Sequence, residues 1–173
     1  MIIDFHSHIL PGIDDGARTL EESIQIVKAM SAMGFDRITC TPHITKKYRN
    51  TPENIKERFD LLVTGMKDSG TEVDLRMSAE YRLNPETWPD ILAKGKLMPI
   101  EDKFILMEFP INDESDMYGL DPEEEFRKVI SLGLTPILPH PERYAYLPHE
   151  TLLRYVDLGV RIQSNYGSLA GIY

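Results

Sequence analysis

Helix-like and strand-like segments alternate along this chain, and the alternation restricts the folds that it can adopt. Amphipathic segments with apolar residues at helical spacing end at a glycine and are followed at once by apolar segments typical of strands. Strands that alternate with helices pair in parallel, with the helices packed outside the sheet. The sequence therefore predicts an α/β protein with a parallel sheet. Three such junctions are Met33-Gly34, Leu132-Gly133 and Leu158-Gly159.

Residues that favour helix ends place the predicted helices. Thr19 and Glu22 have the spacing of a capping box, before a helix that ends at Gly34. Thr51-Pro52 begins a second helix, because proline is well tolerated in the first turn. Further predicted helices cover residues 85–93, 122–132 and 148–158, and predicted strands cover residues 1–8, 35–41, 73–79, 104–107, 134–139 and 160–164.

Size and composition indicate one globular domain. The chain has 173 residues, 42% of them hydrophobic, and no linker or low-complexity segment, so we expect a single domain over residues 1–173. Nineteen basic and 28 acidic residues give a net charge of −9, which argues against non-specific binding to nucleic acid or to an anionic membrane. An anionic substrate remains possible, since bound metal ions can reverse the local field.

The single cysteine, Cys40, excludes a disulfide framework and a cysteine-based zinc site. It is also unsuited as a phosphatase nucleophile, because Lys46 stands where the C-x5-R type needs an arginine. No segment approaches the ~18 apolar residues of a membrane span. The N-terminal residues do not resemble a signal peptide, so we expect a cytoplasmic protein.

His6 and His8 lie two residues apart in the first predicted strand, so both side chains should point to the same face. Two neighbouring imidazoles can hold one Zn, Fe, Mn or Cu ion. Taken alone, such a pair is more often one surface histidine and one core histidine. Asp14-Asp15-Gly16, taken alone, favours a turn.

Further side chains able to bind metal follow the other predicted strands, and functional groups collect at the carboxyl ends of parallel strands. Glu108 ends an apolar run, where its carboxylate needs a cation or hydrogen bonds unless it reaches water. His140 lies between two prolines, in a rigid frame that suits either a ligand or a turn. His149 shows no such context and is interpreted as a surface residue. The predicted metal ligands are His6, His8, Asp15, His43, Glu80, Glu108 and His140.

Seven nitrogen and oxygen ligands are too many for one tetrahedral zinc ion. They suit two or three clustered divalent ions, and mixed histidine and carboxylate ligands favour Mn, Zn or Fe over Ca or Mg. Such a cluster lowers the pKa of bound water and stabilises an in-line displacement at phosphorus. The ligand set therefore indicates metal-dependent phosphoryl chemistry.

Residues 3–17 resemble the opening motif of the polymerase-and-histidinol-phosphatase (PHP) superfamily, and in particular of its bacterial capsule-associated tyrosine phosphatases. Later segments are similar to the later motifs of that family, in the same order and over essentially the whole chain. These segments are Thr41-Pro42-His43, Ser78-Ala79-Glu80, Met107-Glu108-Phe109 and Pro139-His140-Pro141-Glu142-Arg143-Tyr144.

The resemblance implies a distorted (β/α)7 TIM-like barrel with a three-metal site. It implies one ion bound by His6, His8 and Glu80. Glu80 would bridge to a second ion bound by Glu108 and His140, and Asp15 and His43 would bind the third. Arg143 corresponds to an arginine that contacts substrate phosphate, for which a guanidinium is well shaped, although it could also be a surface charge beside Glu142.

The chain departs from the family pattern near its end. The family carries an Asp-x-His motif after a seventh strand, but no such motif follows His140 in this sequence. We therefore expect a barrel truncated after about six strands, either as a fragment of a longer protein or as an open barrel completed by a partner chain.

These observations lead to one main hypothesis and two alternatives. The main hypothesis is a metal-dependent protein tyrosine phosphatase, most simply with Mn, in which a metal-bridging hydroxide attacks phosphotyrosine. The resemblance implies a bacterial tyrosine autokinase as its partner and a role in capsular or extracellular polysaccharide synthesis. An open barrel would expose sheet edges and apolar surface, so a homo-oligomer is possible. The alternatives are a small-molecule phosphomonoesterase of the histidinol-phosphate type and a non-catalytic binding module that lacks the last metal motif.

Overall fold

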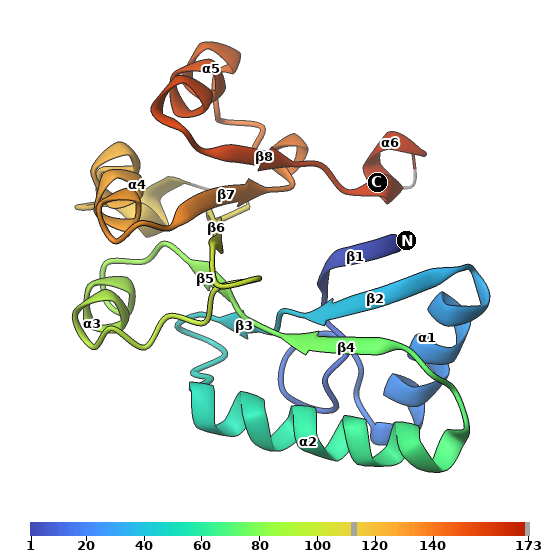
Figure 1. Cartoon of the computed structure of the whole chain (residues 1–173). Helices are drawn as coiled ribbons and strands as arrows, with labels where there is room; N and C mark the ends of the chain where they lie inside the picture. Colours follow the sequence, from blue (N-terminus) through green and yellow to red (C-terminus); the bar gives the residue numbers. More distant parts are fainter. Residues whose placement is uncertain (112–113, 172–173) are drawn as a thin grey trace. The chain divides into compact units, whose positions relative to one another are not determined.

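The computed structural model describes residues 1–111 and 114–171, and these form two compact units (Figure 1). The N-terminal unit comprises Met1–Ala79 and the C-terminal unit comprises Glu80–Tyr173. Each unit is a layer of parallel strands covered by helices, so the predicted parallel α/β architecture is confirmed.

The N-terminal unit is built on a parallel sheet in the order β1-β2-β4. Its strands are β1 (Ile2–Ser7), β2 (Phe35–Cys40) and β4 (Asp74–Met77), and the short β3 (His43–Ile44) follows β2. Asp4 pairs with Ile38 and Ser7 pairs with Cys40, so β1 carries one more residue than β2 between these pairs. Such an irregularity bends a strand and re-aims its side chains, and here it lies at His6.

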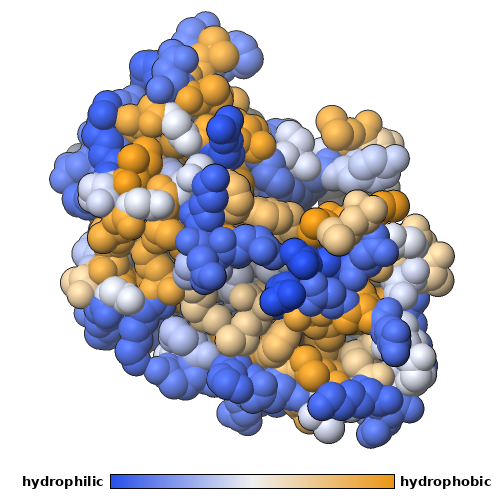
Figure 2. Space-filling view, in the orientation of Figure 1, coloured by the Kyte–Doolittle hydropathy of each residue, from blue (hydrophilic) through white to orange (hydrophobic). Residues whose placement is uncertain are grey.

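Two helices cover this sheet on one side and pack against each other: α1 (Leu20–Ala32) and α2 (Pro52–Ser69). A Cβ added at Gly65 of α2 would lie 2.9 Å from Ile24 Cδ1 of α1, so the glycine permits the close approach of the two helices. The buried residues of α2 are Ile55, Leu62 and Met66. Figure 2 shows its outer face, along the lower edge of the view, as mainly hydrophilic.

The helix caps follow the sequence closely, with one difference. Thr51 caps α2 in a reciprocal box with Asn54. At α1 the Thr19 side chain accepts from the backbone N–H of Glu22, as predicted. The Glu22 carboxylate, however, accepts a hydrogen bond from Arg18 N, one residue before the predicted partner. The predicted capping box at Thr19 is therefore only half correct.

The C-terminal unit contains parallel strands in the order β5-β6-β7-β8, namely β5 (Glu80–Arg82), β6 (Phe104–Glu108), β7 (Thr135–Pro139) and β8 (Arg161–Gln163). Its core contains stacked and edge-on aromatic rings, including Phe109, Phe126 and Tyr155. The helices are α3 (Trp88–Ala93), α4 (Pro122–Ser131), α5 (His149–Leu158) and α6 (Tyr166–Leu169), with 3-10 turns η1 (Glu114–Met117) and η2 (Pro141–Arg143). No helix within residues 1–111 and 114–171 is long and apolar enough to cross a membrane.

The predicted strand over residues 73–79 is wrong in its extent. β4 ends at Met77, and a separate strand, β5, begins at Glu80. Ser78 N still donates to Cys40 O, whereas Glu80 pairs with Leu106 of β6. The chain therefore changes its ladder partner between Ser78 and Glu80, a change that a continuous β-forming sequence does not reveal. Glu80 is consequently the first residue of a strand and not the residue after one.

Candidate metal centre

His6 and His8 face each other in the N-terminal unit. His6 lies in β1 and His8 follows its last residue, and their Nε2 atoms are 3.2 Å apart. The rings are tilted by 53°, with 5.2 Å between their centroids. Two imidazole nitrogens that converge in this way can bind one cation together.

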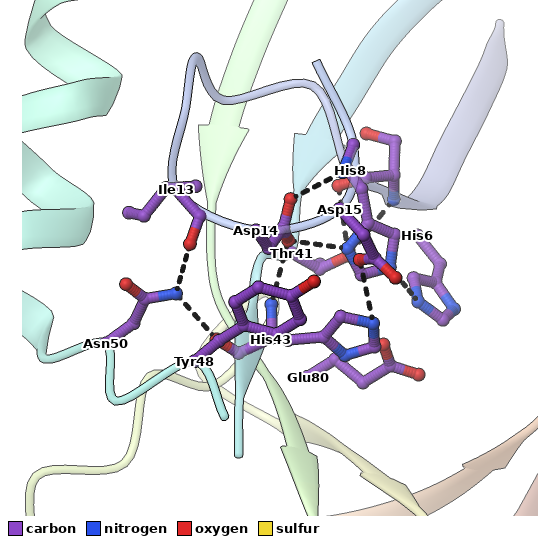
Figure 3. A network of polar contacts seen from close by, with 12 residues as sticks. His6, His8, Ile13, Asp14, Asp15, Thr41, His43, Tyr48, Asn50 and Glu80 are labelled. Atoms are coloured by element: carbon purple, nitrogen blue, oxygen red, sulfur yellow. Dashed lines mark hydrogen bonds and ion pairs between the residues drawn. The ribbon is translucent and has the colours of Figure 1, made fainter. Parts of the chain in front are cut away.

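His43 and Asp15 lie beside His8 (Figure 3). His43 Nε2 is 3.4 Å from Asp15 Oδ1, and the rings of His8 and His43 are 4.4 Å apart between centroids. His8, Asp15 and His43 each offer a ligand atom within 4.8 Å of the others. The Asp15 side chain is 62% exposed, so this carboxylate can rotate toward a cation from solvent.

Asp14 was not among the predicted ligands, yet its carboxylate is buried and contacts two of them. Its Oδ2 lies 2.8 Å from His8 Nδ1 and accepts from His43 N at 3.1 Å, and its Oδ1 accepts from Gly16 N at 2.9 Å. Burial raises the pKa of Asp14, but the hydrogen bond and charge of His8, with the two backbone N–H groups, outweigh burial and hold the pKa below its usual range. Residue type and spacing gave no signal for these contacts of Asp14.

A short loop after β3 packs against His43, and sequence reasoning missed its contribution. Asn50 Nδ2 donates to Ile13 O at 3.1 Å and to His43 O at 2.8 Å, which ties this loop to the loop that carries Asp14 (Figure 3). The Tyr48 ring stacks parallel to His43, with 5.9 Å between centroids. The orientation of His43 is thus supported from one side by an aromatic ring.

Asp4 of β1 is a further acid near the histidine pair, half-buried, with an inaccessible Oδ2 atom. Burial raises its pKa, against the opposing effects of Ser7 and of the His6 and His8 charges. Among the described residues, no group hydrogen-bonds to its Oδ2 atom. A buried carboxylate oxygen in this position is stabilised when positive charge is bound nearby.

In the C-terminal unit, Glu80 and His140 form a buried pair. His140 Nε2 lies 3.0 Å from Glu80 Oε1, and their side chains are 4% and 0% exposed. His140 follows β7 and has a left-handed backbone, with φ 38° and ψ 53°, between Pro139 and Pro141. A non-glycine residue in this region is strained, and such strain is concentrated at functional sites.

Glu108 is held by an arginine that sequence reasoning did not select. Arg82 donates from Nε to Oε1 at 3.0 Å and from an Nη atom to Oε2 at 3.2 Å. The pair exists because Arg82 and Glu108 are register partners on β5 and β6. Burial lowers the pKa of Arg82, but the Glu108 and Glu80 carboxylates outweigh burial and raise it.

Arg143 ends the 3-10 turn η2, and its side chain is exposed to solvent. Its neighbours anchor the turn: Glu142 accepts from Asn165 N at 2.9 Å, and the Tyr144 hydroxyl accepts from Phe109 N at 3.1 Å. The guanidinium is thus free to meet an anion at the surface. His149, interpreted as a surface residue, is exposed.

The donors found here fit divalent metal ions. Neutral imidazole nitrogen and carboxylate oxygen are ligands for Mn, Zn and Fe. The Nε2 atoms of His6 and His8, 3.2 Å apart, converge as two ligands of one ion do. The structure brings His6, His8, Asp15 and His43 together in one unit. In the other it pairs Glu80 with His140 and Glu108 with Arg82.

This chain is similar to proteins named tyrosine-protein phosphatases. A family model described as capsular polysaccharide synthesis, CpsB/CapC, matches residues 2–173. The tyrosine-protein phosphatase YwqE of Bacillus subtilis is 35% identical over 99% of this chain and 67% of its own length. The tyrosine-protein phosphatase CpsB of Streptococcus agalactiae is 30% identical over 95% of this chain and 67% of its own length.

A solved structure supports the same relationship. It comes from crystal structures of YwqE from Bacillus subtilis and CpsB from Streptococcus pneumoniae, described as unique metal-dependent tyrosine phosphatases. The match has a TM-score of 0.87 and 32% identity, and it covers 99% of this chain and 69% of that chain. The chain thus spans about two thirds of the length of these relatives.

Proposed function

Because the chain belongs to the capsular polysaccharide synthesis CpsB/CapC family, we propose that it hydrolyses phosphotyrosine in a protein, in a reaction that depends on divalent metal ions. The observation that carries the proposal is the convergence of His8, Asp15 and His43, with His6 facing His8. A phosphate dianion is repelled by carboxylates, so substrate binding beside Asp15 requires cations.

We propose two or three ions, with Mn as the working metal, held by the seven predicted ligands. When bound, they would supply a Lewis acid that lowers the pKa of water and stabilises negative charge on phosphoryl oxygens. The support is the mixture of imidazole and carboxylate donors and the family resemblance. The proposed ligands are His6, His8, Asp15, His43, Glu80, Glu108 and His140.

The chain's own residues would bind and orient the substrate. Arg143 is exposed beside an anchored turn, so its guanidinium can pair with two phosphoryl oxygens. The strained backbone of His140 would hold its imidazole against Glu80, which fixes the ring on one side. We also propose that the fold is the distorted (β/α)7 TIM-like barrel of the PHP superfamily, in which the parallel strands of this chain would be consecutive strands of the barrel.

The proposed substrate is a phosphorylated bacterial tyrosine autokinase, and the proposed process is the control of capsular or extracellular polysaccharide synthesis. The support is the family description and the names of the relatives. A cytoplasmic location follows from that substrate, whose kinase activity needs ATP. Assembly into a homo-oligomer belongs to the same proposal.

The test is a phosphate-release assay on the metal-depleted chain with a phosphotyrosyl peptide, with and without added Mn²⁺. We expect activity only with Mn²⁺, and its loss on addition of EDTA. His6→Ala should reduce kcat by about 10²-fold or more, in the range seen for loss of a key catalytic group. His149→Ala is the matched control, because it removes an exposed imidazole far along the chain.

Two results would overturn the proposal. One is phosphotyrosine hydrolysis that persists in EDTA or in His6→Ala. The other is a kcat/KM for histidinol phosphate well above that for the phosphotyrosyl peptide, which would make the chain a small-molecule phosphomonoesterase.

A further inference from the structure

Asp14 connects three segments around the candidate metal centre of the N-terminal unit (Figure 3). Its carboxylate contacts the ring of His8 at the end of β1 and the backbone of His43 in β3. It also contacts Gly16 in its own loop. Its side chain has no exposed area, so these contacts are shielded from competing water. One side chain thus sets the mutual positions of groups that lie 35 residues apart in sequence, His8 and His43.

The contact with His8 determines which ring nitrogen carries the proton. An ionised carboxylate only accepts hydrogen bonds, so Nδ1 of His8, 2.8 Å from Asp14 Oδ2, is the donor. A neutral imidazole protonated at Nδ1 carries its lone pair on Nε2. That Nε2 is the atom that faces His6 Nε2 at 3.2 Å. The lone pair of His8 is therefore directed to the place where a cation would be shared with His6.

We propose that Asp14 is a positioning residue that locks His8 in the Nδ1-protonated tautomer and so presents its Nε2 lone pair to a divalent cation. The inference rests on the proposed function, because it assigns a role within the same metal centre. Partners of this kind, which accept the second ring N–H of a ligating histidine, orient the ring and increase its basicity. Asp15, its neighbour in sequence, contacts His43 from the exposed side and has a different role.

The backbone around Asp14 is shaped to hold this contact. A Cβ added at Gly16 would lie 1.9 Å from His8 O and 2.6 Å from His8 Cβ, so only glycine allows the loop to approach β1 so closely. Ala17 N donates to His8 O at 3.1 Å, which closes the loop onto the same residue. The loop therefore contacts both the backbone and the ring of His8.

Asparagine cannot reproduce all the contacts of Asp14. Both carboxylate oxygens accept, Oδ2 from His8 and His43 and Oδ1 from Gly16. An amide offers one accepting oxygen and one donating nitrogen. In the Asp14→Asn variant the NH₂ group would therefore face a donor, either Gly16 N–H or the groups of His8 and His43, and would make no hydrogen bond to it. If the NH₂ group faces His8, the ring has to carry its proton on Nε2, where it blocks metal binding.

The test compares the wild-type chain, Asp14→Asn and Asp68→Asn, a control that makes the same charge change at an exposed position of α2. Two-bond ¹H–¹⁵N spectra of the metal-free chain, at a pH where the rings are neutral, report the tautomer of His8. Competition with a chromophoric chelator reports Zn²⁺ affinity and the number of ions bound at saturation. We expect the Nδ1–H tautomer in the wild type. We also expect affinity about 10- to 100-fold weaker in Asp14→Asn, with unchanged stoichiometry.

Each contrary outcome has a definite meaning. An Nε2–H tautomer in the wild-type chain would overturn the proposal, and this measurement needs no variant to fold. Zn²⁺ affinity within about twofold of wild type in Asp14→Asn would also overturn it, and fewer ions at saturation would make Asp14 itself a ligand. Since neither readout involves turnover, a chain that gives the expected tautomer and affinity but hydrolyses no phosphotyrosine would refute the proposed function alone.

Discussion

Arg82 covers both oxygens of Glu108 with a bidentate pair, at 3.0 and 3.2 Å, across neighbouring strands. The Glu108 side chain is completely buried and that of Arg82 is 30% exposed. The guanidinium therefore supplies positive charge to the buried Glu108 carboxylate.

Replacing Arg82 should destabilise the metal-free chain strongly. Arg82→Met leaves a buried carboxylate without its cation, and we expect a loss of about 3 kcal/mol in the free energy of unfolding. Arg154→Met is the control, because Arg154 pairs with Glu123 at the surface and should contribute less than about 1 kcal/mol. Urea unfolding in EDTA measures both. Equal effects of the two substitutions would contradict this account of Glu108.

Gly16→Ala should lower the stability of the N-terminal unit by more than the change in backbone freedom from glycine to alanine accounts for. Its Cβ would collide with His8 O at 1.9 Å, and backbone atoms cannot yield as a flexible side-chain end can. Gly133→Ala is the control: Gly133 has φ +79°, and its added Cβ meets no described atom within 4 Å. That control should lose about 1–2 kcal/mol from its left-handed backbone. Thermal unfolding of both variants measures the two stability losses. A smaller loss for Gly16→Ala than for Gly133→Ala would refute the prediction.

Asp74 should make a small contribution to stability that depends on pH and salt. The hydrogen bond from Arg76 is the largest cause that lowers the pKa of Asp74; the hydrogen bond and charge of Arg37 and the charge of Arg76 add to it, and together they outweigh burial, which raises the pKa. A carboxyl whose pKa is lowered by folding stabilises above its unfolded pKa of about 3.9, and this stability is lost as pH falls through the lower folded pKa.

The measurement is the difference in unfolding free energy between the wild type and Asp74→Asn at several pH values. Because the pair is exposed, we expect about 0.5 kcal/mol at pH 7, shrinking to nothing in acid and in high salt. A difference that grows as the pH falls would have the wrong sign for this mechanism.

Cys40 should be unreactive in the folded chain. It is buried in β2, and burial together with the Asp4 charge raises the pKa of its thiol far above neutral pH. Iodoacetamide should leave it unmodified until the chain is unfolded, as mass spectrometry of the two states would show. Rapid alkylation of the native chain would mean that β2 opens readily.

The alternation of helices and strands, and the glycines at their junctions, were sufficient to predict a parallel α/β fold. The reason is local: capping residues such as Thr51 and left-handed glycines such as Gly70 act within one turn of the chain. The exposed state of His149 was equally predictable from its immediate neighbours, whereas the apolar run before Glu108 left open whether its carboxylate is buried or reaches water.

Relationships between distant segments could not be predicted in this way. Arg82 reaches Glu108 only because β5 and β6 pair in one register, and the register depends on the change of partner between Ser78 and Glu80. The different burial of Asp14 and Asp15 depends on a turn of the backbone that points one side chain inward and the other outward. Neither residue type nor spacing carries that information.

His140 combines a strained backbone with a buried side-chain contact. Its left-handed backbone, with φ 38°, would be relaxed by glycine, which adopts that conformation freely. Glycine would also remove the imidazole that lies 3.0 Å from the buried Glu80 carboxylate, so relief of the backbone strain at position 140 costs a contact that helps Glu80 tolerate burial.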